Sequence, residues 1–130
     1  MKYLADSDFL VGLFREEDPN HVKSMKLMES GYAQEELTAL NLVIQESATV
    51  LSHRTGMDAV RLFWDRFPKL NITIIPMDEE LERESWKIFL KQTKKGCSFV
   101  DCANLAVVEK YKLDGILSFD EFYPKNIRID

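Results

Sequence analysis

Apolar residues recur along the chain at two spacings, and these predict alternating strands and helices. The segment Met57–Phe67 places apolar residues on successive helical turns and stops at Pro68, as an amphipathic helix does. The segment Asn71–Pro76 contains a run of β-branched residues, which favours a strand. Further strands are expected at Lys2–Ala5, Leu37–Leu40, Gly115–Ser118 and, at an edge, Ile127–Ile129. Further helices are expected at Phe9–Arg15, His21–Ser30, Asn41–Arg54, Asp78–Lys91 and Ser98–Tyr111, with Asn41 and Asp78 as N-caps.

This alternation of elements predicts the fold class. Strands that alternate with helices require crossover connections, which give a mostly parallel sheet covered on both faces. We therefore expect a three-layer α/β/α sandwich with four or five strands. The chain has 130 residues and no internal repeat or linker-like segment, so one domain over residues 1–130 is expected. In such a sheet the ligand crevice lies at the carboxyl ends of the strands.

The chain lacks the sequence features of a membrane or secreted protein. Its longest uninterrupted apolar run, Phe9–Phe14, is too short to span a bilayer. Asp6 and Asp8 interrupt the segment where a signal peptide would be apolar. Cys97 and Cys102 lack the partners of a zinc site and are expected to be free thiols in a reducing compartment. We therefore expect a cytoplasmic protein.

Four acids fall at positions where chemistry is expected. Asp6 directly follows the first strand, and Asp120 follows the strand Gly115–Ser118. Asp101 lies in the first turn of a helix, and Glu46 lies on an otherwise apolar helix face. Clustered carboxylates repel one another unless a cation neutralises them, and a set of oxygen ligands without His or Cys favours Mg²⁺ or Mn²⁺. The pattern predicts a divalent-cation site that could hydrolyse a phosphodiester.

Each acid also has an ordinary structural interpretation. Asp6 could cap the helix that follows it. Asp101 could form a capping box with Ser98, and Asp120 could belong to a turn. Glu46 could be exposed if its helix were slightly rotated. Four separate structural roles do not explain why acids fall at two strand ends, at a helix start and on an apolar helix face. A single site formed by all four acids is therefore the stronger hypothesis.

The net charge of −5 argues against a protein that binds nucleic acid through bulk positive charge. Without the four acids the balance is −1, so an acidic cation site leaves the rest of the chain close to neutral. The basic residues Lys91, Lys94 and Lys95 precede the Asp101 helix. They could receive RNA phosphates, or they could simply complement the dipole of the preceding helix.

Four segments resemble the motifs of the PIN-domain family. Tyr3–Leu10 resembles the opening motif, in which an Asp ends the first strand and Ser or Thr follows, and Asn41–Glu46 resembles the motif with a helical Glu. Ser98–Ala106 and Ile116–Phe122 resemble the third and fourth motifs and are the most specific. The acids are separated by 40, 55 and 19 residues, which fits the family, and the resemblance covers the whole chain.

The resemblance implies a metal-dependent endoribonuclease that cleaves single-stranded RNA. Compact members are mostly VapC-type toxins of toxin–antitoxin pairs, which form homodimers and are silenced by an antitoxin lying across the active site. By this resemblance the metal ligands and catalytic residues are Asp6, Glu46, Asp101 and Asp120. Candidate supporting residues behind them are Ser7, Asp8, Asn104 and Ser118, although Asn104 could equally serve only to pack its helix. Many family members have Asn at the position of Asp8. Asp8 either adds a fifth acid to the site or, in our preferred interpretation, caps the following helix.

Other function classes remain open. One alternative is a catalytically silent PIN domain that binds RNA or serves as a scaffold. Another is an aspartyl-phosphate phosphohydrolase of the haloacid dehalogenase type, suggested by Asp6-Ser7-Asp8, although no matching catalytic Lys is found. A receiver domain is disfavoured because the region near Asp58 is helical in pattern.

Overall fold

A computed structural model describes all 130 residues, and at its centre is a sheet of five parallel strands. The strand order is β3-β2-β1-β4-β5. The strands are β1 (Lys2–Ala5), β2 (Glu36–Leu40), β3 (Thr73–Ile75), β4 (Gly115–Leu117) and β5 (Arg128–Ile129). The helices are α1 (Ser7–Phe14), α2 (His21–Glu29), α3 (Asn41–Arg54), α4 (Met57–Arg66), α5 (Glu79–Leu90) and α6 (Phe99–Lys110). Two 3₁₀ helices are η1 (Tyr32–Gln34) and η2 (Phe67–Leu70).

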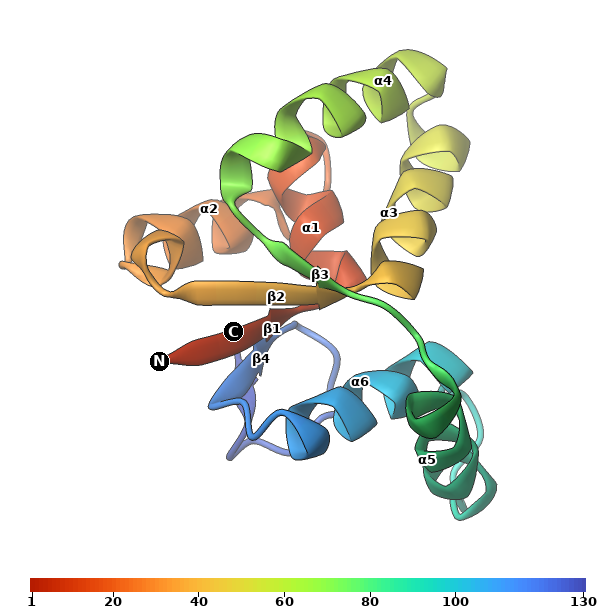
Figure 1. The fold of residues 1–130 in the computed structure, drawn as a ribbon. Helices are drawn as coiled ribbons and strands as arrows, with labels where there is room; N and C mark the ends of the chain where they lie inside the picture. The colour runs from red at the N-terminus through yellow and green to blue at the C-terminus, as the bar shows by residue number, and fades with distance from the viewer.

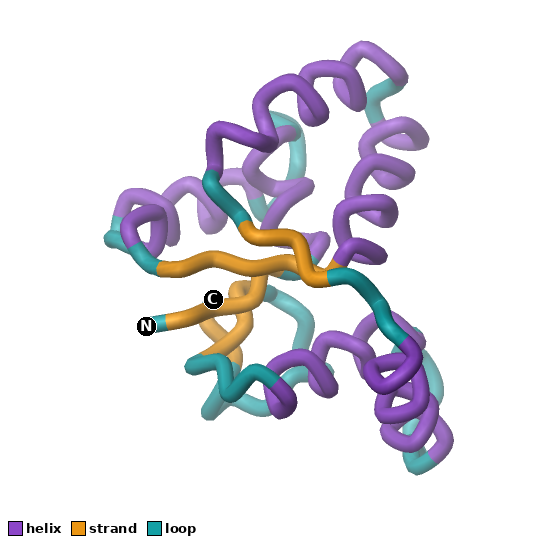
Figure 2. Tube along the Cα trace, in the orientation of Figure 1, coloured by secondary structure: helices purple, strands orange, loops and turns teal.

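The helices cover both faces of the sheet. Figure 1 shows α1 to α4 on one side of the sheet and α5 and α6 on the other. Figure 2 shows the strands as the middle layer. The central strand β1 and its neighbour β4 are almost wholly buried, with Leu4, Ala5, Ile116 and Leu117 inaccessible to solvent. The predicted three-layer α/β/α sandwich with a parallel sheet is confirmed.

The strand order places a switch point between β1 and β4. The chain first adds β2 and β3 on one side of β1 and later adds β4 and β5 on the other. At the carboxyl ends of these strands, the Asp6 amide donates to the Leu117 carbonyl at 3.0 Å, and the Ser118 amide donates to the Ile129 carbonyl at 3.1 Å. A crevice at such a switch point is where parallel sheets bind their ligands.

Most predicted elements match, and the exceptions have local causes. The first helix begins at Ser7 rather than Phe9, because the Asp6 side chain caps it by accepting from the Ser7 amide. The prediction of Asn41 as N-cap is wrong, since Leu40 holds that position. The Asn41 side chain instead accepts from the amides of Leu42 and Met77, both at 3.0 Å, and ties α3 to the segment after β3. No helix has the length and apolar character needed to cross a membrane.

Candidate active site

Asp6 lies at the carboxyl end of β1 and is the most enclosed of the predicted site residues that carry a carboxylate, with 4% of its surface exposed. Three groups donate to its carboxylate. The Ser7 amide lies 2.8 Å from Oδ1, the Asn104 Nδ2 amide 3.1 Å from Oδ1, and the Ser118 hydroxyl 2.8 Å from Oδ2. These donors come from α1, α6 and the end of β4, so the carboxylate is fixed from three sides.

The surroundings of Asp6 disfavour its negative charge. Burial, followed by the charge of Asp8, raises the pKa of Asp6 to about 7, and the charge of Asp101 adds to the rise. Burial also raises the pKa of Asp8 to about 6, with a contribution from Asp120. No ion pair involves any of these four acids. The result is a set of neighbouring carboxylates without an ion-pair partner from the protein.

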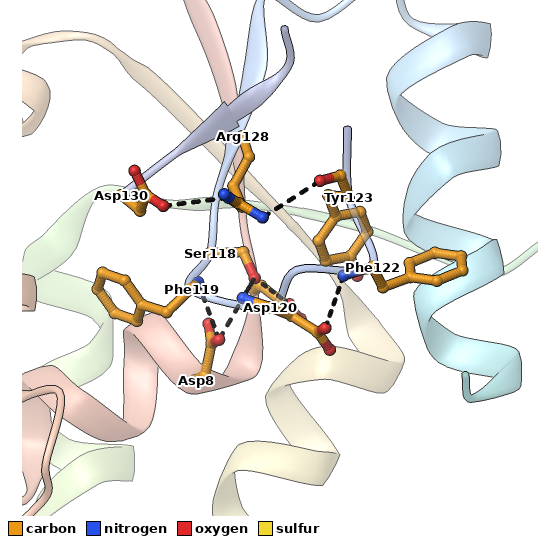
Figure 3. Close-up of polar contacts among 9 residues, drawn as sticks. Asp8, Ser118, Phe119, Asp120, Phe122, Tyr123, Arg128 and Asp130 are labelled. Atoms are coloured by element: carbon orange, nitrogen blue, oxygen red, sulfur yellow. Dashed lines mark hydrogen bonds and ion pairs between the residues drawn. The ribbon is translucent and has the colours of Figure 1, made fainter. Parts of the chain in front are cut away.

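Asp8 and Asp120 meet at the turn that follows β4 (Figure 3). The Phe119 amide donates to Asp8 Oδ2 at 2.9 Å, and the Ser118 hydroxyl lies 3.4 Å from the same oxygen. The Asp120 amide donates to Ser118 Oγ at 3.1 Å. Because the single Ser118 proton is better placed for Asp6, its contact with Asp8 is weak. Our interpretation of Asp8 as the helix cap is therefore wrong, since Asp6 caps α1 and Asp8 binds the turn.

Asp101 forms the capping box that was its structural interpretation. Its Oδ2 accepts from the Ser98 amide at 2.9 Å, and its own amide donates to Ser98 Oγ at 3.0 Å, which completes the capping box of α6. Its Oδ1 lies 3.4 Å from the Tyr123 hydroxyl, which also contacts Asn104. Asp101 therefore starts a helix and faces the Asp6 site. The turn interpretation of Asp120 also holds, because its Oδ1 accepts from the Phe122 amide at 2.9 Å.

Glu46 is the predicted site residue that the structure connects least to the others. It is half-buried on α3 and takes part in none of the hydrogen bonds or ion pairs. Val50, one turn later on α3, lines a cavity of about 180 Å³ together with Ser7 and Asp8. The face that carries Glu46 thus borders the acidic pocket, whereas its carboxylate makes no contact with the other acids.

The chemistry of these residues fits a hard divalent cation, although their oxygens do not converge on one point. No three of the acidic, Cys or His side chains are close enough together to share a metal ion. Asp6, Asp101 and Asp120 each direct an oxygen to a protein donor, whereas two buried oxygens, Asp8 Oδ1 and Asn104 Oδ1, have no partner. An oxygen-only donor set with unpaired acceptors and no protein cation suits Mg²⁺ or Mn²⁺. Side-chain rotation is needed to bring the ligands together.

A cleft that opens beside Asp101 and Asp120 is lined by both acidic and basic side chains. It has a volume of about 460 Å³, and its charged lining residues are Lys94, Lys95, Asp101, Asp120 and Glu121. Neither lysine has an ion-pair partner. Lys91 does not line the cleft. A larger cavity of about 570 Å³ lies between α1, α2 and α4 and contains none of the predicted site residues.

Comparison with known proteins identifies the family. The family model described as "PIN domain" matches residues 3–126, which is nearly the whole chain. The chain belongs to the PIN-domain family. Comparison with curated proteins gives no match at the level of sequence.

Two solved structures share this PIN-domain fold. VapC20 of Mycobacterium tuberculosis, described as a Sarcin-Ricin loop cleaving toxin, is 21% identical with a TM-score of 0.79, over 91% of this chain and 89% of that one. VapBC2 of Rickettsia felis, solved with a DNA fragment from its promoter, is 12% identical with a TM-score of 0.70, over 99% of this chain and 98% of that one. At these identities the likeness shows the fold.

Sequence reasoning about the PIN-domain site missed Tyr123. This residue is 1% exposed, and burial together with the charges of Asp6 and Asp101 raises the pKa of its hydroxyl. In the sequence it lies in the run Phe122-Tyr123-Pro124, a pattern that predicts only hydrophobic packing. No local pattern indicates that its hydroxyl faces acids from other elements.

Proposed function

We propose that this PIN-domain protein is a divalent-cation-dependent endoribonuclease for single-stranded RNA, and that it is the toxin of a toxin–antitoxin pair. The observation that carries this proposal is the group of acids at the carboxyl ends of β1 and β4. Asp6, Asp101 and Asp120 come from three separate segments, their charges act on Asp6 or on the neighbouring Tyr123, and no protein cation pairs with them. A buried carboxylate such as Asp6 costs stability beside other acids unless a cation compensates it.

We assign Asp6, Glu46, Asp101 and Asp120 as the residues that would hold Mg²⁺ or Mn²⁺. When bound, the cation supplies stabilisation of charge on the phosphate and a lowered pKa for an attacking water. Asp6 is the fixed member, because three protein donors hold its carboxylate. Asp101 and Asp120 border the cleft and can orient a substrate that enters it.

The charged residues that line the cleft support RNA as the substrate. Lys94 and Lys95 face the same opening as Asp101 and Asp120 and lack ion-pair partners. Lysines in this position can bind phosphate groups on either side of the scissile bond. Changing Lys94 and Lys95 together to Gln is expected to raise the KM for RNA several-fold and to weaken the salt dependence of binding. The matched control is Lys69→Gln. Lys69 is an exposed residue of η2, and its side chain makes no hydrogen bond or ion pair.

The biological role is proposed from the family and from the neighbouring structures. VapC20 is described as a toxin, and VapBC2 as a complex on promoter DNA. We infer that this chain binds a small antitoxin protein and, from its resemblance to the family, that it forms a homodimer. Induced expression of the chain is then expected to arrest bacterial growth, and co-expression of a small adjacent gene product to restore it. Growth unaffected by high expression of active enzyme would contradict the toxin role.

The nuclease activity is tested with purified protein and a labelled single-stranded RNA. Cleavage is expected with Mn²⁺ or Mg²⁺ and is expected to stop with EDTA. Asp101→Asn should remove it, whereas Asp65→Asn, which makes the same charge change on an exposed face of α4, should not. RNA binding without cleavage under all these conditions would instead assign a silent RNA-binding PIN domain.

A further inference from the structure

Tyr123 is buried next to the acids, although the proposed chemistry gives it no role. Its ring packs edge-to-face on Phe122, with centroids 5.3 Å apart, so most of the side chain is ordinary core. Its hydroxyl is different, because it lies 3.0 Å from Asn104 Nδ2 and 3.4 Å from Asp101 Oδ1. A buried phenol needs hydrogen-bond partners, and the partners of this one are a proposed metal ligand and the amide that contacts another.

The direction of these hydrogen bonds is fixed by chemistry. Asn104 directs its Nδ2 group at the Asp6 carboxylate, because the reverse orientation would set the amide oxygen against the carboxylate. The same Nδ2 group donates to the Tyr123 oxygen, so the Tyr123 proton must point to Asp101. Asp6, Asn104, Tyr123 and Asp101 therefore form one chain of hydrogen bonds across the site.

The backbone of Tyr123 connects this chain to the remaining acid. The Tyr123 amide donates to the Asp120 carbonyl at 3.3 Å, in the turn that also fixes the Asp120 carboxylate through the Phe122 amide. Arg128 Nη1 lies 3.5 Å from the Tyr123 carbonyl and holds the turn against β5. One residue thus links the strand that carries Asp6, the helix that carries Asp101 and the turn that carries Asp120.

We propose that Tyr123 is a positioning residue that sets the spacing of the Asp101 and Asp6 carboxylates for the divalent cation. This inference rests on the proposed function. Its hydroxyl reaches Asp101 through a long contact of 3.4 Å and reaches Asp6 through Asn104. Partners behind metal ligands commonly fix ligand orientation, and their loss typically weakens metal binding about 10- to 100-fold.

The test is Mn²⁺ binding to the purified protein, measured as free Mn²⁺ by electron paramagnetic resonance. Tyr123→Phe removes the hydroxyl and keeps the ring. It is expected to raise the Mn²⁺ concentration at half-saturation about 10-fold and to lower the rate of RNA cleavage at sub-saturating Mn²⁺. Tyr3→Phe is the matched control. Tyr3 is also buried, but its hydroxyl contacts only the Met1 sulfur, at 3.4 Å, at the other end of β1.

The outcomes separate this proposal from the proposed function. If the wild type binds Mn²⁺, and Asp6→Asn abolishes that binding while Tyr123→Phe leaves half-saturation unchanged, the positioning role is wrong and the metal site stands. If the wild type binds no Mn²⁺, the metal-dependent function fails and the positioning role falls with it. Melting temperatures of the metal-free Tyr123→Phe and Tyr3→Phe proteins show whether either variant is merely unfolded.

A second variant keeps the test decisive if Tyr123→Phe folds poorly. Asn104→Leu removes the amide that joins Tyr123 to Asp6 and conserves side-chain size. It is expected to weaken Mn²⁺ binding, and adding Tyr123→Phe should then cost less than it does in the wild type, because both act in one chain of hydrogen bonds. Fully additive effects in the double variant would overturn the proposed link.

Discussion

Two buried aspartates in this protein show opposite ways of being neutralised. Asp18 is 7% exposed, and its carboxylate is paired with Arg54 at 3.3 Å and Arg15 at 3.8 Å. Asp6 is 4% exposed and has only neutral donors and other acids around it. The chain therefore supplies arginines where a buried acid serves the fold. Their absence at Asp6 indicates that something outside the chain supplies the charge there.

The ion-paired Asp18 lies near the acids at the end of β1. Asp18 and Arg54 line the same small cavity as Asp8. Arg54 is directed at Asp18 rather than at Asp8, so a cation is at hand and is used elsewhere. An arginine is thus present near both sites, and the two sites differ in which carboxylate the arginine pairs with.

Asp6→Asn is expected to give the largest effect. It conserves side-chain shape and removes a proposed metal ligand, so RNA cleavage should fall roughly 10³-fold, as loss of several kcal/mol of transition-state stabilisation implies. Folding should not suffer, because Asn remains a good helix cap. The measurements are the rate of cleavage and the melting temperature. A large loss of stability without a loss of cleavage in the folded fraction would reverse the assignment of this acid.

Asp18→Asn is expected to have the opposite profile. Removing the charge leaves Arg15, whose side chain is mostly buried, without its ionic partner, so the free energy of unfolding should fall by about 2 kcal/mol. Cleavage by the protein that remains folded should be close to that of the wild type. Urea denaturation together with cleavage assays below the unfolding transition checks both points. Loss of cleavage in fully folded protein would show that the two acids are not separable.

The raised pKa of Asp6 predicts how the stability of the metal-free protein depends on pH. The raised pKa of Asp6, about 7 against 3.8 for the ordinary group, means that the folded state holds a proton between these values where the unfolded chain does not. Stability from this group is therefore present below pH 4 and is lost as pH rises toward and through 7. The metal-free protein should melt a few degrees lower at pH 8 than at pH 5.

Mn²⁺ should remove most of this difference by stabilising the protein at pH 8. Asp78, whose pKa is lowered by the Leu81 amide and by nearby Lys110, is already ionised across this range and does not contribute. Asp6→Asn should reduce the pH dependence even without metal and leave the part due to Asp8, whose pKa burial raises to about 6. A wild-type melting temperature that rises from pH 5 to pH 8 would contradict the direction of the shift.

Lys110→Gln is expected to give the smallest effect. Lys110 pairs with Asp78 and Glu80 on the exposed side of α5 and α6, at 3.5 and 3.3 Å. Exposed pairs contribute little because water screens them. Both the melting temperature and the cleavage rate should match those of the wild type within error. A marked loss would show that ion pairs at the surface matter more in this fold than the contrast between Asp18 and Asp6 allows.

The sequence was informative about the fold because the relevant signals are local. Apolar spacing and the break at Pro68 predicted the elements, and their alternation predicted the parallel sheet. The motif resemblance directed attention to acids that the fold does bring to one end of the sheet, Asp6, Asp101 and Asp120.

The sequence was less informative wherever a side chain acts across elements. Nothing near Asp8 predicts that it binds the Phe119 amide rather than capping its own helix, because its partner is 111 positions away. Tyr123 was missed for the same reason. Asn41 is of a residue type that is common at N-caps. Its side chain instead accepts from the Met77 amide, a contact that forms only once β3 lies beside β2.

The central claim is that the acids at the carboxyl end of β1 are compensated by a divalent cation. The most direct measurement is anomalous scattering from a crystal of the protein grown or soaked with Mn²⁺. The predicted result is a strong peak within coordinating distance of the Asp6 and Asp101 carboxylates, absent from crystals of Asp6→Asn. Anomalous density only at other acids, such as the exposed cluster near Asp78, would contradict the account.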